Sequence, residues 1–266
     1  MYVVKASGEK EEFDIEKVRR TCLRAGASKE LADKIAKEVE KKAHDGMPTK
    51  EIRDIVIKLL EEEPAAAAKY DLKRAIMSLG PAGFTFEKFM ARVLENYGYK
   101  TKVGEVLRGK CVDHEIDIVA EKDGKRYLVE CKYHNAPGIY TDLKVVLYTH
   151  ARFLDLGKNF DHVWLICNTK CTNEARRYAK CVGLKITSWR YPRRESLEKM
   201  IEKKNLYPVT ILKSVKGLAR DGLFQAGIML AKDLSSYELE DLKRRTDLPQ
   251  DTLNKIMEEV RRVCVC

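Results

Sequence analysis

The stretch that decides the fold is Glu115 to Tyr133, which reads EIDIVAEKDGKRYLVECKY. Two runs of alternating side chains flank Asp123-Gly124, the residue pair best suited to a two-residue type I′ turn. The stretch therefore predicts a β-hairpin whose register the turn fixes. The expected cross-strand pairs are Lys122 with Lys125, Val119 with Leu128, and Asp117 with Glu130.

The alternation divides this hairpin into two faces. One face is apolar and is expected to be core: Ile116, Ile118, Ala120, Tyr127, Val129 and Cys131. The other face carries Asp117, Glu130 and Lys132, beside Val119 and Leu128. Carboxylates that face each other across a sheet repel, so the pair requires a counter-ion, and its oxygens suit Mg²⁺ or Mn²⁺.

This triplet has the parts that metal-assisted phosphodiester hydrolysis needs. Asp117 and Glu130 would hold the metal, which activates a water molecule. Lys132 would orient that water and offset charge on the phosphate. A solvated face, on which Lys132 pairs with Glu130 or Glu115, accounts for the same residues and stays open on this pattern alone.

The segments around the hairpin predict a mixed sheet with helices packed on it. Helices are expected at 84–97, 139–157 and 173–181, and strands at 101–108, 115–121, 126–133, 163–168 and 184–189. This order, with Asp117 followed by Glu130-Cys131-Lys132, resembles the PD-(D/E)xK nuclease superfamily and most of all its Mrr-type restriction endonuclease branch. The resemblance spans about 84–190. It implies that Glu87, on the first helix, completes a metal site with Asp117 and Glu130 and joins the catalytic set.

The N-terminal residues predict a hairpin, with one strand at 2–5 and a second running through Glu12-Phe13, followed by helices at 15–26, 28–44, 48–61 and 64–77. The runs Val3 to Gly8 and Phe13 to Val18, and the later Thr49 to Ile52, resemble the ATP-cone, a domain that binds ATP or dATP. The resemblance implies that Lys5 and Lys17 meet the triphosphate, with the base and ribose held by Glu11, Asp14, Val18, Thr49 and Arg53. Ala6 departs from the family, which usually has Arg there, so we expect weaker phosphate binding.

The C-terminal residues from 193 onward predict four or five short helices. The last two form a helical hairpin with its turn at Thr246 to Pro249. This hairpin resembles the helix-hairpin-helix modules of repair proteins, although its turn lacks the Gly through which those modules bind phosphate. DNA binding and subunit packing both remain open for this segment.

The composition favours a polyanionic partner. The formal net charge is +10, and the excess of Lys and Arg is greatest in the middle third of the chain. Every apolar run is too short or too interrupted to span a membrane, and the first ten residues lack the apolar core of a signal peptide. A cytoplasmic protein without a membrane partner is therefore expected.

Together these features predict an α/β multi-domain protein: a hairpin-plus-helices ATP-cone over 1–80, an αβββαβ-type nuclease core over 81–192, and an all-α domain over 193–266. The expected function is Mg²⁺- or Mn²⁺-dependent DNA endonuclease activity, regulated by ATP or dATP, in a homodimer. The sequence has no P-loop, so the nucleotide is expected to regulate rather than to be hydrolysed. Two alternatives are a nucleotide-sensing DNA-binding regulator with an inactive nuclease fold, and an RNA-processing nuclease.

Overall fold

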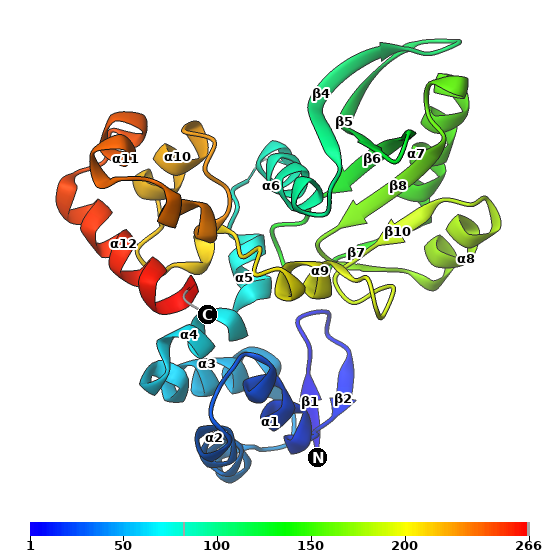
Figure 1. Ribbon diagram of the computed structural model, residues 1–266. Coiled ribbons are helices and arrows are strands. Elements are labelled where there is room, and N and C mark those ends of the chain that lie inside the picture. The colour runs from blue at the N-terminus through cyan, green and yellow to red at the C-terminus, as the bar shows by residue number, and fades with distance from the viewer. Residues whose placement is uncertain (82, 265–266) are drawn as a thin grey trace. The chain divides into compact units, whose positions relative to one another are not determined.

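The computed structural model of the chain describes residues 1–81 and 83–264. Two compact units are formed: one is Ile76–Pro208, and the other combines Met1–Ala75 with the segment that begins at Val209. Each unit is described by itself below. The predicted mixed α/β class is confirmed, since the chain contains a five-stranded mixed sheet, a small N-terminal sheet and a helical C-terminal region (Figure 1).

The unit Ile76–Pro208 is built on a five-stranded sheet of strand order β10-β8-β6-β5-β4. Its strands are β4 (Lys100–Arg108), β5 (Asp113–Lys122), β6 (Lys125–Lys132), β8 (His162–Cys167) and β10 (Lys185–Thr187). β4, β5 and β6 are an antiparallel meander, whereas β8 lies parallel to β6 and β10 parallel to β8. The sequence-based order of a meander followed by alternating strands and helices is confirmed.

Helices cover both faces of this sheet. They are α6 (Gly83–Asn96), α7 (Leu143–Leu156) and α8 (Asn173–Cys181). The unit also contains the short α9 (Leu197–Lys203) and a small parallel pair of strands, β7 (Tyr140–Thr141) and β9 (Lys170–Cys171). In Figure 1, α6 lies on one side of the sheet, and α7 and α8 lie on the other. Val119 and Leu128 belong to a buried cluster with Val146 of α7 and Ala175 of α8. Val119 and Leu128 on the carboxylate-bearing face are therefore covered, whereas Asp117 and Glu130 are partly buried and Lys132 is exposed.

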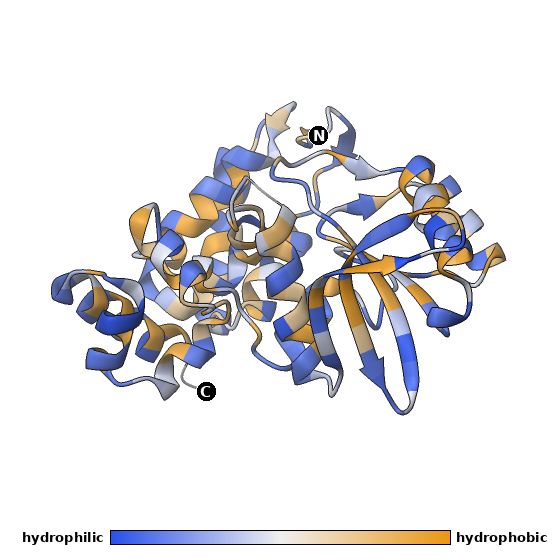
Figure 2. Ribbon diagram, turned by 90° about the horizontal axis from the view of Figure 1, so that it is seen from above, coloured by the Kyte–Doolittle hydropathy of each residue, from blue (hydrophilic) through white to orange (hydrophobic). Residues whose placement is uncertain are grey.

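The turn of the central hairpin has the predicted geometry. Asp123 and Gly124 adopt φ angles of 51° and 71°, and positive φ at both positions defines a type I′ turn. The register follows as expected, with Lys122 opposite Lys125 and Val119 opposite Leu128. In Figure 2 the strands of the large sheet carry hydrophobic residues along their central parts.

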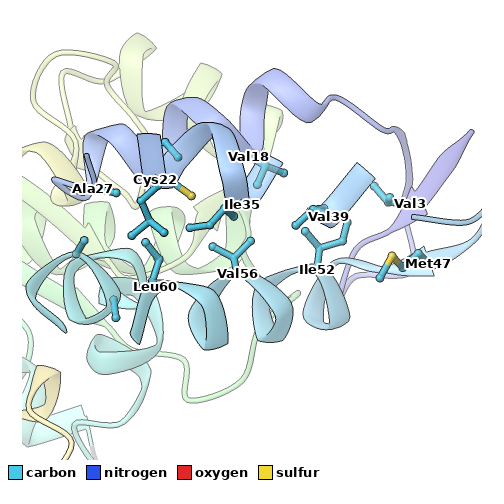
Figure 3. Close-up of a cluster of buried hydrophobic side chains, with 14 residues drawn as sticks. Val3, Val18, Cys22, Ala27, Ile35, Val39, Met47, Ile52, Val56 and Leu60 are labelled. Carbon is cyan, nitrogen blue, oxygen red and sulfur yellow. The ribbon is translucent and has the colours of Figure 1, made fainter. Parts of the chain in front are cut away.

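The other unit begins with the small sheet β2-β1-β3, made of β1 (Tyr2–Val4), β2 (Lys10–Glu12) and β3 (Met47–Pro48). Its helices there are α1 (Ile15–Arg24), α2 (Lys29–Lys42), α3 (Thr49–Leu59), α4 (Pro64–Tyr70) and α5 (Leu72–Met77, whose last residues belong to the sheet unit). Buried side chains from strands and helices meet in one cluster, which includes Val3, Ile35 and Val56 (Figure 3). Two details differ from expectation: β3 is an added strand, and the helix predicted over 64–77 divides at Asp71.

The C-terminal part of the same unit is helical, with α10 (Leu218–Gln225), α11 (Leu239–Thr246) and α12 (Gln250–Cys264). The predicted final hairpin is present: α11 ends at Thr246, and Asp247 turns the chain with a φ of 53°. Gly222 of α10 packs against this turn, since a Cβ there would lie 2.9 Å from the Thr246 carbonyl oxygen. Across the described residues, none of the helices has the length and apolar character that a bilayer span requires.

Candidate active site and nucleotide site

The ladder between β5 and β6 ends just before the candidate catalytic residues. The last backbone pair on the side away from the turn is Ile118 with Val129. Beyond that pair, the Asp117 carboxylate accepts a hydrogen bond from the Cys131 backbone N–H, with Oδ2 2.7 Å from the nitrogen. Burial raises the pKa of Asp117, and the Cys131 N–H and the Arg152 charge partly offset this. Asp117 is thus fixed in place by the backbone of the neighbouring strand.

Glu130 is held on β6, which continues beyond the hairpin ladder by pairing with β8 opposite Leu165. Its side chain is only 14% exposed and forms an ion pair with Arg152. Burial, and then the negative charge of Asp117, raise the pKa of Glu130 to about 7, and the Arg152 charge opposes that rise. The charge of Asp117 therefore acts on Glu130, as expected for neighbouring residues. The two residues are not, however, a backbone pair of the β5–β6 ladder.

Lys132 follows two residues later on the same strand, where its backbone pairs with Cys167 of β8. The side chain is exposed, and its positive charge favours the ionised forms of both Asp117 and Glu130. An exposed ammonium group beside two partly buried carboxylates is able to contact a phosphate group.

Glu87 projects from α6, the helix that packs on β4, β5 and β6. Its pKa is raised to about 7, first by burial and then by the charges of Asp117 and Glu115. Glu87 also raises the pKa of Glu130. The sequence-predicted third carboxylate therefore lies in the same electrostatic neighbourhood as the other two.

The three carboxylates are nevertheless not arranged as a complete set of metal ligands. Within residues 1–81 and 83–264, no three His, Cys, Asp or Glu side chains are arranged so that they could hold a metal ion. The chemistry of the donors still fits a hard divalent cation, because all three candidates offer carboxylate oxygens and each has a pKa raised by burial. The assignment of Glu87, Asp117 and Glu130 as metal ligands stays a prediction.

Sequence reasoning missed Arg152, whose side chain is only 7% exposed. One Nη atom donates to the Glu130 carboxylate and the other to the backbone carbonyl of Glu115. The position carries a signal that could have been read, because Arg152 falls on the buried stripe of α7 with Val146, Thr149 and Leu156. A charged residue on such a stripe must have a partner.

Two histidines flank the carboxylates and are held by different contacts. His114 Nε2 lies 2.7 Å from Asp155 Oδ2, so this ring is engaged with α7. The backbone of His134 is bracketed by the buried Asn168 amide, which accepts from its N–H at 2.9 Å and donates to its carbonyl at 2.7 Å. Burial and the nearby Lys132 charge lower the pKa of His134. The amide of Asn168 therefore fixes the chain just after β6.

Three of the predicted nucleotide-binding residues meet at the small N-terminal sheet. The Glu11 carboxylate lies between two ammonium groups, 2.8 Å from Lys5 Nζ and 2.5 Å from Lys17 Nζ. These two hydrogen bonds lower the pKa of Glu11 to about 2. The two lysines assigned to the triphosphate are thus adjacent, and Glu11 offsets one of their two positive charges.

The other predicted nucleotide residues have separate local roles. Asp14 caps α1 by accepting from the Lys17 backbone N–H, and Val18 is buried in the hydrophobic cluster. Thr49 is the first residue of α3. On that helix Arg53 donates to Asp71, with Nε 3.0 Å from Oδ1. Their place around a base and ribose stays a prediction.

Comparison with known proteins agrees with this architecture. Residues 1–77 match the family model of the ATP cone domain, 81–193 match that of a restriction endonuclease of the Mrr catalytic type, and 207–264 match that described as AF1548-like, C-terminal. The chain therefore joins an ATP-cone domain to a restriction-endonuclease-like domain and a helical C-terminal domain, as its sequence predicts.

Similar proteins come from Archaeoglobus fulgidus. One uncharacterized protein is 45% identical over 175 residues, which cover 65% of this chain and 99% of that protein. A second is 54% identical over 39 residues, or 15% of this chain and 83% of that protein. A solved structure described as "Crystal Structure of Protein of Unknown Function AF1548" is 42% identical, covers 68% of this chain and 98% of its own, and has a TM-score of 0.63. The chain belongs to this AF1548-like family.

Proposed function

We propose that the protein is a metal-dependent DNA endonuclease whose activity is regulated by ATP or dATP at the N-terminal cone. The observation that carries the proposal is the pair of partly buried carboxylates, Asp117 and Glu130, beside the exposed Lys132 in a restriction-endonuclease-like domain. Buried carboxylates with raised pKa values are costly to the fold, and such groups concentrate at functional sites. The basic charge of the chain supports a nucleic-acid substrate.

The carboxylates would hold the metal and the lysine would meet the phosphate. Asp117 is oriented by the Cys131 N–H, so it can present its second oxygen without reorganisation. Glu130 and Glu87 would supply further oxygen ligands. A divalent cation bound there activates water as the nucleophile and stabilises charge on the phosphate.

Lys132 would act on the substrate rather than on the fold. Its exposed ammonium group can donate to a phosphate oxygen and orient the attacking water. Asn168 supports this role indirectly, because it holds the backbone that follows the lysine. Homodimer formation, which would allow both strands of a duplex to be cut, belongs to the same proposal.

The cone would control the reaction by binding a nucleotide through Lys5 and Lys17. The Glu11 carboxylate contacts both ammonium groups and Glu9 also pairs with Lys5, so a triphosphate would displace these carboxylates or share the lysines with them. A nucleotide that binds one arrangement of the protein better than another shifts the population toward that arrangement. The nucleotide is a regulatory ligand in this proposal, and steady ATP hydrolysis by the purified protein would contradict it.

The test is an assay on duplex, single-stranded, flap and junction DNA, with single-stranded RNA as a competitor, in Mg²⁺ or Mn²⁺ with and without ATP and dATP. The proposal expects cleavage of DNA that EDTA, Asp117→Ala and Lys132→Ala each abolish, and a rate that changes with nucleotide. DNA binding without cleavage under every condition would instead support a nucleotide-sensing regulator. Preferential cleavage of RNA would support an RNA-processing nuclease.

A further inference from the structure

Arg152 joins the two strands at the point where their hydrogen-bond ladder has stopped. One Nη atom reaches the Glu115 carbonyl on β5, and the other reaches the Glu130 carboxylate on β6. The side chain is 7% exposed, and its Nε is buried without a hydrogen-bond partner among the described residues. A buried guanidinium group keeps its proton at all ordinary pH values, so this positive charge is permanent.

The charge balance of the site depends on this arginine. The three carboxylates contribute three negative charges when ionised, and Arg152 and Lys132 offset two of them. Arg152 acts on both Asp117 and Glu130, since its charge lowers the pKa of each. In a site of low dielectric, a fixed positive charge opposes the entry of a doubly charged cation.

The contact also engages the ligand itself. One oxygen of the Glu130 carboxylate is taken by Arg152, so a metal ion can use the other oxygen or must compete with the guanidinium group. Charge and contact therefore act in the same direction, and both weaken metal binding.

We propose that Arg152 is a resident counter-ion that competes with the divalent cation for Glu130 and sets a weak intrinsic metal affinity. This inference rests on the proposed function, because it assumes that the metal binds at Asp117 and Glu130. Arg152 is a positioning residue in this account: it acts through Glu130 and does not touch the substrate. It keeps Glu130 oriented. Because it also keeps the intrinsic metal affinity low, the negative charge of a phosphate can still strengthen metal binding.

The test measures Mn²⁺ binding by the full chain in the absence of nucleic acid, from the electron paramagnetic resonance signal of the free ion. Arg152→Gln should bind Mn²⁺ at least about tenfold more tightly than the wild type, because one nearby positive charge is lost. Arg152→Lys keeps the charge and should bind within about threefold of the wild type. Arg177→Gln removes an exposed arginine of α8 and is the matched control, with no expected change.

Folding is followed in the same samples, since losing Arg152 leaves Glu130 buried without its partner. If Arg152→Gln unfolds in EDTA, the proposal requires that Mn²⁺ restore the fold at concentrations where the wild type gains little stability. Unchanged or weaker Mn²⁺ binding by Arg152→Gln, or a variant that stays unfolded at saturating Mn²⁺, would overturn it. Asp117→Asn separates the two proposals: if that variant still binds Mn²⁺ like the wild type, the metal site itself has failed.

Discussion

Asp117→Asn should stabilise the sheet unit in the absence of divalent cations, although it removes a proposed metal ligand. The Asn side chain keeps an oxygen that can accept from the Cys131 N–H, now 2.7 Å from Asp117 Oδ2. It lacks the negative charge that raises the pKa values of Glu130 and Glu87. The substitution therefore relieves repulsion among buried carboxylates and leaves the local hydrogen bond in place.

The magnitude follows from Glu130, whose pKa rises from 4.5 to about 7. A change of that size corresponds to roughly 3 kcal/mol in favour of the neutral form. Burial is the largest cause and the Asp117 charge the second, so removing that charge should return only part of this free energy. A carboxyl group whose pKa is raised on folding destabilises the fold as pH increases from 4.5 through 7. The gain from Asp117→Asn is thus complete near pH 8 and fades toward pH 5.

Urea unfolding followed by tryptophan fluorescence gives the assay. The chain has two tryptophans, Trp164 and Trp189, and both lie in the Ile76–Pro208 unit, so their emission reports on that unit. Wild type, Asp117→Asn and Asp117→Ala are compared in EDTA at pH 8 and pH 5. The Ala variant should show no gain at pH 8, because it leaves the Cys131 N–H unsatisfied at a cost of about 1–3 kcal/mol. An Asn variant that is no more stable than wild type at pH 8, or equally stabilised at pH 5, would show that the Asp117 charge does not destabilise the fold.

Three further predictions concern pH, the cone and the C-terminal helices. In EDTA, the stability of the wild-type sheet unit in urea should fall between pH 5 and pH 8. The reason is that Glu87 and Glu130 have pKa values raised to about 7, so their charged forms are disfavoured in the folded state. A stability that does not change with pH over this range would contradict the prediction. Lys17→Met should weaken ATP binding several-fold in calorimetric titrations, since one of the two ammonium groups assigned to the triphosphate is lost; unchanged binding would count against the assignment of this site. Gly222→Ala should destabilise the unit that contains α10 by about 1–3 kcal/mol, because the new Cβ would lie 2.9 Å from the Thr246 carbonyl oxygen. Unfolding followed by circular dichroism would measure the loss, and an unfolding midpoint equal to that of the wild type would show that the turn can move at little cost.

The hairpin could be predicted from sequence because its determinants are local. Asp123-Gly124 specifies a turn with positive φ at both positions, and the period of two along each strand then sets register and faces. The same logic located Asp117, Glu130 and Lys132 on neighbouring strands. The predicted cross-strand pair of Asp117 with Glu130 is not part of the ladder, because the ladder ends at Ile118–Val129. Asp117 instead accepts a hydrogen bond from the Cys131 backbone.

Other features depend on contacts between distant segments, which no local pattern specifies. Arg152 is 22 positions beyond its partner Glu130 and reaches it only because α7 packs on the sheet. The two-residue strand β3 forms because Met47 pairs with Val3, 44 positions away. The buried stripe of α7 does indicate that the charge of Arg152 needs a partner, but it does not identify that partner.

The most direct test of the nuclease proposal is the single-turnover cleavage of DNA by the full chain in Mg²⁺, compared between Lys132→Met and Lys125→Met. Both lysines lie on β6, but Lys125 is at the opposite end, where it pairs with Asp161 at 3.2 Å. We expect wild-type cleavage that EDTA abolishes, a loss of about 100-fold or more in Lys132→Met, and a wild-type rate in Lys125→Met. Cleavage that persists in EDTA, or an undiminished rate in Lys132→Met, would contradict it.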